Sequence, residues 1–213
     1  MKKTAKDSGL HNTIKTISVF MLGAQLGFPN GDIKKANESV VEVKTFDKYP
    51  SGGFTLSTSA SGFFVSDQGH ICTCYHLVKG GKDDLFVIHN GIQHKAELHN
   101  FDENTNIAIL KIDNVESNKI SIGEDPKIIE NVYAVGNVFG EGQIITKGIV
   151  SGVTFRSRTY IALATETNMQ NNGGILFNES GQAVGILGHI NRNDDTFSGI
   201  GCAMPIKTAE KLL

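Results

Sequence analysis

Short runs of apolar and β-branched residues, separated by turn-forming residues, recur along most of this chain and dominate what it can fold into. The runs cover residues 40–43, 63–65, 85–88, 107–112, 131–135, 144–153, 160–164 and 182–187. Clusters such as Asp67-Gln68-Gly69 and His89-Asn90-Gly91 lie between them and are typical of hairpin turns. Helical periodicity is confined to residues 206–213. The pattern predicts an all-β sandwich or barrel.

The first 38 residues follow a different pattern. An apolar run at residues 17–28 comes after four lysines, which are Lys2, Lys3, Lys6 and Lys15. A basic flank before a short apolar run is typical of a secretory signal, since a confident membrane span needs about 18 apolar residues. An uncleaved membrane anchor and an amphipathic helix are the alternatives. We therefore predict a signal-like or anchor segment at residues 1–38 and a single folded domain at residues 39–213.

Charge and cysteine content narrow the choice of partners and cofactors. A formal net charge of -2 argues against a nucleic-acid partner, because such binding depends on neutralising phosphates. Cys72 and Cys74 share one face of a predicted strand and are poorly placed to bridge each other. Cys202 is a candidate partner for either, but buried free thiols are the favoured interpretation. Neither His70 nor His76 completes a second ligand arm beside the cysteines, so we expect no metal site and no cofactor.

Five motifs follow one another in a fixed order between about Ser39 and Leu213. They span residues 61–78, 101–111, 134–151, 183–186 and 199–205. Together they resemble the HtrA/DegP family of trypsin-like serine proteases. The resemblance implies two perpendicular antiparallel β-barrels with a cleft between them, in a protein that works outside the cytoplasm, in the periplasm. Because the chain ends soon after the last motif, we expect no PDZ domain.

The resemblance places three residues at the positions of a catalytic triad, and two of them are amides. His76 stands at the general base, Asn106 at the aspartate that orients the base, and Asn172 at the nucleophilic serine. An amide in place of that aspartate favours the wrong histidine tautomer, which lowers turnover by about four orders of magnitude. A carboxamide also lacks the acidic hydroxyl that forms an acyl-enzyme. Plainer interpretations are a hydrogen-bonded loop histidine at His76 and a simple turn at Asn172-Gly173.

The positions of the oxyanion hole depart from the family pattern as well. They are Gln170, Asn171 and Asn172, and Gln170 replaces a glycine whose backbone N–H would face the developing oxyanion. Met169 and Ile175 replace prolines of the same motif. Several departures within one short segment favour loss of the reaction. A cysteine protease is disfavoured, because Cys74 and His76 lie on one segment rather than on opposite sides of the cleft.

Loss of hydrolysis leaves binding intact in principle. Proteases of this resemblance hold an extended peptide against a strand, here at Leu187, Gly188, His189 and Ile190. The sequence therefore predicts a protein that binds extended or unfolded peptide, or a partner protein, without cutting it. The alternatives are an active or weakly active serine endopeptidase and a structural subunit of an extracytoplasmic assembly.

Overall fold

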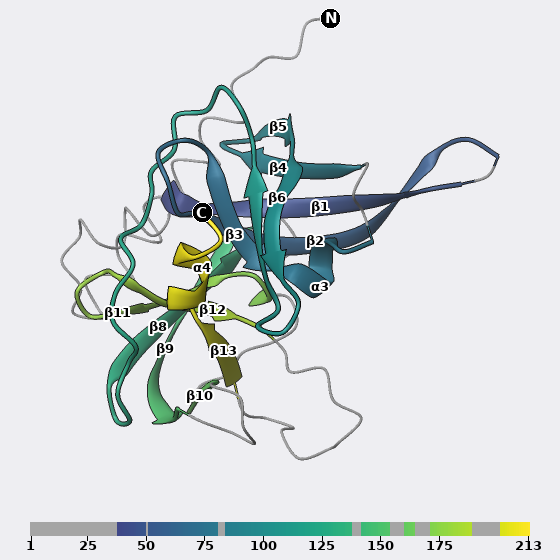
Figure 1. Ribbon diagram of the computed structural model, residues 1–213. Helices are drawn as coiled ribbons and strands as arrows, with labels where there is room; N and C mark the ends of the chain where they lie inside the picture. Colours follow the sequence, from purple (N-terminus) through teal and green to yellow (C-terminus); the bar gives the residue numbers. More distant parts are fainter. Residues whose placement is uncertain are drawn as a thin grey trace, which may run out of the picture.

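The computed structural model describes residues 38–49, 51–80, 84–137, 142–153, 160–164, 171–188 and 201–213. Strands dominate this part of the chain, and they form two sheets that lie side by side (Figure 1). The predicted signal segment, residues 1–38, falls outside the described residues except for Glu38. Among the described residues, no helix is long and apolar enough to cross a membrane.

The first sheet has seven strands in the order β5-β4-β1-β2-β3-β7-β6, with antiparallel neighbours throughout. Its strands are β1 (Val40–Lys48), β2 (Phe54–Phe64), β3 (His70–Cys74), β4 (Leu85–His89), β5 (Ile92–Lys95), β6 (Glu97–Asp102) and β7 (Ile107–Lys111). A one-turn helix, α3 (Tyr75–Val78), follows β3. The sheet is an open half-barrel, with β5 and β6 as its edges.

The second sheet closes on itself in the order β10-β13-β12-β11-β8-β9. Its labelled strands gather in the lower half of Figure 1. Its strands are β8 (Asn131–Asn137), β9 (Gln143–Gly152), β10 (Ile161–Leu163), β11 (Ile175–Asn178), β12 (Ala183–Leu187) and β13 (Gly201–Pro205). The helix α4 (Lys207–Glu210) ends the chain, within the region of predicted helical periodicity. The all-β prediction is confirmed, with the first of the two predicted barrels left open because β5 and β6 do not pair with each other.

The strand β7 shows why several predicted strands are continuous apolar runs. Ile107 and Ile109 face the core shared by the two sheets, whereas Ala108 and Leu110 face the core inside the first sheet. Side chains of a strand alternate between its faces, so a strand buried on both faces must be apolar at every position. The shared core joins residues of both sheets, such as Phe63 and Ile186, and so holds the two sheets against each other.

The cysteines behave as small core residues. Cys72 and Cys74 point into the shared core from one face of β3, and both are free thiols, as is the buried Cys202. Burial raises the pKa of Cys74 to about 12 and that of Cys72 well above its usual range. Neutral thiols are poor nucleophiles and poor metal ligands. Within the described parts of the chain, no group of His, Cys, Asp and Glu is arranged to hold a metal ion.

The turn before β8 carries a backbone strain that predicts a stabilising substitution. Glu130 N donates to Lys127 O at 3.1 Å, and Ile129 within this turn has φ +75° with 78% of its surface exposed. A left-handed backbone costs a residue such as isoleucine about 1–2 kcal/mol in the folded state. Glycine avoids this cost but loses more conformational entropy on folding, worth about 0.5–1 kcal/mol. We expect Ile129→Gly to raise the free energy of unfolding by about 0.5–1 kcal/mol in urea titrations. Ile128→Gly, without positive φ, should lower it, and a loss of stability in Ile129→Gly would contradict the strain.

Two buried histidines predict acid destabilisation. Burial lowers the pKa of His70 below 6.5, helped by His99 and Lys111. Burial also lowers the pKa of His89, helped by His94 and opposed by a backbone hydrogen bond. Below pH 6.5 the unfolded chain therefore binds more protons than the folded one, and stability falls as the pH drops through the lowered pKa values.

Urea titrations between about pH 7.5 and pH 5.5, above the range of ordinary carboxylates, measure this loss. In the double variant His70→Asn/His89→Gln, the free energy of unfolding should depend less steeply on pH than in the unmodified protein. Parallel curves for the two proteins would exclude these histidines as the cause.

Candidate functional site

His76 lies on α3, directly after β3, and the start of this helix is fixed by its neighbours. Tyr75 N donates to Asn106 O at 3.0 Å. The Tyr75 ring stacks on Phe101 with ring centroids 4.3 Å apart and planes 4° from parallel. Phe101 belongs to β6. Contacts from two later segments therefore set the position of a helix too short to be stable alone.

His76 and Asn106 contact each other through backbone and side chain. The backbone N–H of His76 donates to Asn106 Oδ1 at 2.9 Å, and Asn106 Nδ2 is 2.8 Å from His76 Nδ1. The backbone N–H sets the orientation of the amide, with Oδ1 as the acceptor, and Oδ1 also lies 3.2 Å from Nδ1. The shorter contact favours Nδ2 as the donor to Nδ1, an assignment that puts the ring proton on Nε2. This is the tautomer that cannot accept a proton at Nε2.

Asn106 also meets a backbone requirement at this position. It has φ +59°, in the left-handed region, at the end of the turn between β6 and β7. Asn and Asp are the residues other than glycine that adopt this conformation most easily. The backbone favours both side chains, so the choice of amide over carboxylate changes the chemistry without changing the turn.

The segment that carries Asn172 is linked by hydrogen bonds, through Ser61, to β3, the strand that precedes His76. Ser61 N donates to Asn172 O at 3.0 Å, and Thr73 Oγ1 donates to Ser61 O at 2.8 Å. Ser61 lies on β2, and Thr73 lies on β3 three residues before His76. Asn172, which is only 7% exposed, thus comes from the closed barrel and is fastened to the open sheet at the end near His76.

The turn at residues 171–174 is shaped by Gly173. This residue has φ +81°, and an added Cβ would lie 2.0 Å from Ser61 O. Gly173 N donates to Leu187 O at 2.7 Å, and Gly174 N donates to Asn171 O at 2.9 Å. The conformation of the turn therefore depends on a glycine that no other residue can replace without moving β2.

Two predicted oxyanion-hole positions, Asn171 and Asn172, are buried, and Gln170 lies outside the described residues. Asn171 packs so closely on β8 that a Cβ at Gly136 would lie 3.0 Å from its Cα. Its side-chain Oδ1 is buried without a hydrogen-bond partner among the described residues.

The segment predicted to hold peptide begins inside the barrel. Leu187 N donates to Gly174 O at 2.8 Å, and Leu187 O accepts from Gly173, so both backbone groups of Leu187 are engaged within the domain. Gly188 N donates to Cys202 O at 3.1 Å. His189 and Ile190 lie outside the described residues. Of the segment predicted to hold peptide, the structure therefore describes Leu187 and Gly188.

Sequence comparison agrees with this geometry. A family model described as "Trypsin-like peptidase domain" matches residues 60–186, which include His76, Asn106 and Asn172. The chain belongs to the trypsin-like peptidase family. This confirms the HtrA/DegP resemblance carried by the motifs.

Curated members of this family include proteins named "Probable periplasmic serine endoprotease DegP-like". The one from Halomonas elongata is 35% identical over 156 residues, covering 70% of this chain and 33% of its own length. The one from Pseudomonas savastanoi is 36% identical over the same length, with the same coverage. "Protease Do-like 1, chloroplastic" from Arabidopsis thaliana is 31% identical over 164 residues, covering 70% of this chain and 37% of its own length. The chain thus spans about a third of the length of these relatives.

A solved structure, "HtrA-type protease AlgW with decapeptide", superposes on this trypsin-like peptidase domain with a TM-score of 0.73. It is 25% identical in sequence, and the match covers 85% of this chain and 65% of that one. The superposition supports the pairing of an open sheet with a closed barrel described above.

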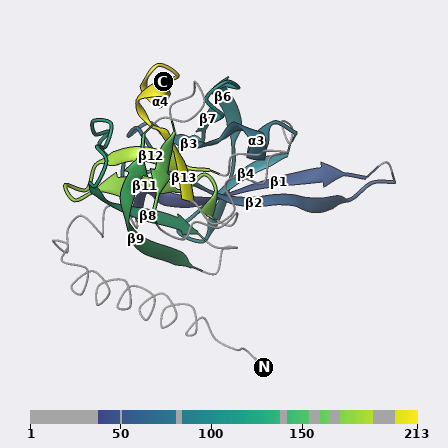
Figure 2. The same cartoon turned by 90° about the horizontal axis from the view of Figure 1, so that it is seen from below.

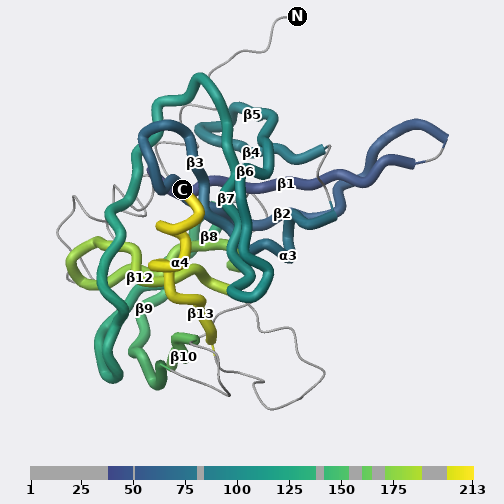
Figure 3. Tube along the Cα trace, in the orientation of Figure 1, coloured from purple at the N-terminus to yellow at the C-terminus, as the bar shows by residue number. Residues whose placement is uncertain are grey.

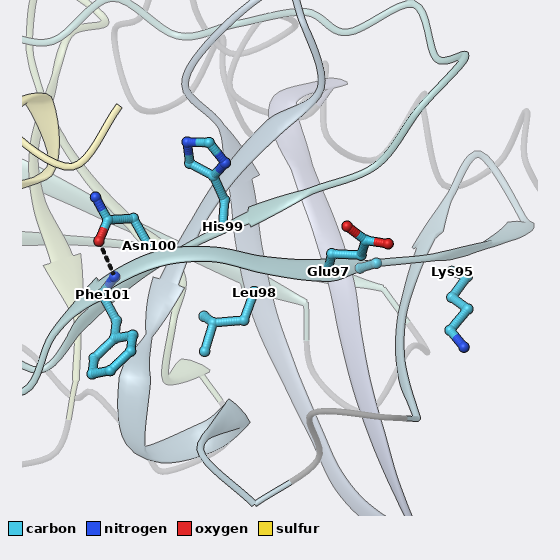
Figure 4. Close-up of a pocket in the computed structure, with 7 residues that line it drawn as sticks. Lys95, Glu97, Leu98, His99, Asn100 and Phe101 are labelled. Atoms are coloured by element: carbon cyan, nitrogen blue, oxygen red, sulfur yellow. Dashed lines mark hydrogen bonds between the residues drawn. The ribbon is translucent and has the colours of Figure 1, made fainter.

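A groove of about 560 Å³ lies along β6, an open edge of the trypsin-like domain (Figure 4). Leu98 and Phe101 point to one side of the strand, and His99 points to the other. None of the three triad positions lines this groove. A second hollow of about 370 Å³ includes Thr105, the neighbour of Asn106, together with residues of β13 and α4. The residues that line these two hollows do not include His76, Asn106 or Asn172.

Sequence reasoning missed the residues that fasten the two sheets at the site. Ser61 and Thr73 stand in the first family motif, but nothing in the sequence marked them as the link between Asn172 and β3. The stack of Tyr75 on Phe101 was equally unmarked. The signal that would have identified Ser61 and Thr73 is the presence of small hydroxyl residues within strands of the trypsin-like motif.

Proposed function

We propose that this domain binds extended peptide or a partner protein without hydrolysing it. The observation that carries the proposal is Asn172, an amide side chain at the position where the motif resemblance places the nucleophilic serine. An amide has no acidic hydroxyl, and its nitrogen lone pair is delocalised, so no acyl-enzyme can form at this residue.

The contact between His76 and Asn106 supports the same proposal independently. A general base must leave Nε2 free to accept the proton of the nucleophile, and the observed contacts favour a proton on that atom. Restoring a hydroxyl at residue 172 alone would therefore leave a poor base. Two separate obstacles to hydrolysis are more consistent with a binding protein than with a weakened enzyme.

Peptide binding is supported by the fold that this chain shares with AlgW. The structural neighbour AlgW carries a decapeptide, and this chain matches it over 85% of its own length. We place the peptide beside Gly188, His189 and Ile190, where main-chain groups pair with an extended strand. Leu187 contributes by holding the turn at residues 171–174 in place. Because curated relatives are named periplasmic, we place the protein outside the cytoplasm.

Fluorescence anisotropy with a library of labelled, unfolded peptides tests this function. We expect saturable binding, with every recovered peptide intact by mass spectrometry. Gly188→Val should weaken binding at least tenfold, because its Cβ would lie 2.7 Å from Met204 Cε and would displace the segment beside which we place the peptide. Gly152→Val is the matched control, since an added Cβ meets only Ala162 at 3.7 Å. Cleavage that His76→Ala abolishes would instead establish a serine endopeptidase, and absence of any binding would favour a structural subunit.

A further inference from the structure

The strands β1 and β2 leave the first sheet and continue as a two-stranded ribbon that projects from the body of the protein (Figures 1 and 3). Pairing of β1 with β4 ends at Thr45, and β2 pairs with β3 only at its far end. A register shift between Thr45 and Phe46 marks the start of the ribbon. The turned view in Figure 2 shows the same projection. We call residues 46–49 and 51–56 the ribbon tip.

The ribbon tip exposes large apolar side chains. Tyr49, Phe54 and Leu56 are 52%, 58% and 49% exposed. No residue from 49 to 60 carries a charge, although charged residues make up 20% of the chain. A cluster of exposed apolar residues on a projecting element usually marks an interaction surface.

The ribbon tip has two chemically different faces. Lys48 pairs with Phe54 and Phe46 pairs with Leu56, so these four side chains share one face because alternate residues of a strand point the same way. Asp47 pairs with Thr55 on the opposite face. The apolar face therefore carries a lysine, and the nearby carboxylate points away from it. Phe46 also packs edge-on against Phe86 of β4, at a centroid distance of 5.7 Å, which anchors the base of this face.

We propose that the ribbon tip inserts shallowly into an anionic lipid surface. Aromatic side chains favour the interface between headgroups and acyl chains, and the long stem of a lysine reaches from there to the headgroups. Lys48 beside Phe54 and Leu56 gives a face that is apolar and positive, which matches anionic lipid. Such a small apolar area gives weak and reversible binding.

The absence of tryptophan from the chain provides a local reporter for this contact. Phe54→Trp in the full chain should show a blue-shifted emission with phosphatidylcholine vesicles that contain phosphatidylglycerol, and quenching by brominated lipid. Ile92→Trp is the control, because Ile92 is 61% exposed on β5, away from the ribbon tip. Its emission should stay unchanged even where another segment brings the protein to the vesicle.

The charge of the face is tested by Lys48→Gln in the Phe54→Trp background, which should reduce the shift, whereas Asp47→Asn should not. Four results would overturn the proposal. They are an unshifted Phe54→Trp, an equal shift in both tryptophan variants, an equal shift with vesicles that lack phosphatidylglycerol, and a shift that grows with protein concentration without lipid. The last would show that a second protein copy covers the tip. None of these readings depends on peptide binding, so the two proposals fail separately.

Discussion

Restoring both missing triad groups, by Asn172→Ser together with Asn106→Asp, is expected to convert this protein into one that reacts with a fluorophosphonate probe. The serine supplies a hydroxyl, and the aspartate accepts a hydrogen bond from the protonated His76 Nδ1, which leaves Nε2 free as the base. The backbone N–H of His76 already donates to the oxygen at residue 106, and the left-handed backbone there suits aspartate equally well. The double variant should label about four orders of magnitude faster than Asn172→Ser alone.

Comparing the single, double and triple variants separates the effect of the missing hydroxyl at residue 172 from that of the His76 tautomer. Asn106→Asp alone should stay unlabelled, since it lacks a nucleophile. Adding Gln170→Gly to the double variant should raise the rate by a further factor of about 10² to 10³, the worth of one oxyanion-hole donor. Equal labelling of Asn172→Ser with and without Asn106→Asp would show that the His76 tautomer is not set by residue 106.

Gly173→Ala is expected to cause the largest loss of stability among single methyl additions to the described glycines near the site. The added Cβ would lie 2.0 Å from Ser61 O and 2.5 Å from Thr73 Oγ1, in a backbone with φ +81°. Backbone strain and a forced shift of β2 together should cost more than about 3 kcal/mol in the free energy of unfolding. Urea titration followed by circular dichroism measures this loss.

Gly91→Ala is the matched control for that experiment. Its φ of +78° is nearly the same, but nothing lies within 4 Å of an added Cβ. It should cost only the strain of the left-handed backbone, about 1–2 kcal/mol. Similar losses in both variants would mean that the turn at residues 171–174 is not held tightly between β2 and β3.

The pattern of apolar residues predicted most of the strands and turns of the fold. The run at residues 107–112 predicts a strand, and the structure places β7 there, between two cores. The open first sheet was not predictable, because closure depends on whether the edge strands β5 and β6 meet, which no local pattern encodes. The strained turn at Ile129 was equally hidden, since an exposed isoleucine gives no sign of positive φ.

The candidate site was predictable in its residues but not in its bonding. The motifs placed His76, Asn106 and Asn172 at corresponding positions, yet the direction of the Asn106 amide depends on a hydrogen bond from the His76 backbone. The engagement of both Leu187 backbone groups also escaped the sequence, because it depends on the path of the turn at residues 171–174. Such details need coordinates, since they join residues more than ten positions apart.

The central claim is that the unmodified protein forms no covalent intermediate, and fluorophosphonate labelling tests it most directly. Purified protein and His76→Ala should both stay unlabelled and leave casein intact, while Asn106→Asp with Asn172→Ser becomes labelled under the same conditions. Labelling of the unmodified protein that disappears in His76→Ala would contradict the claim.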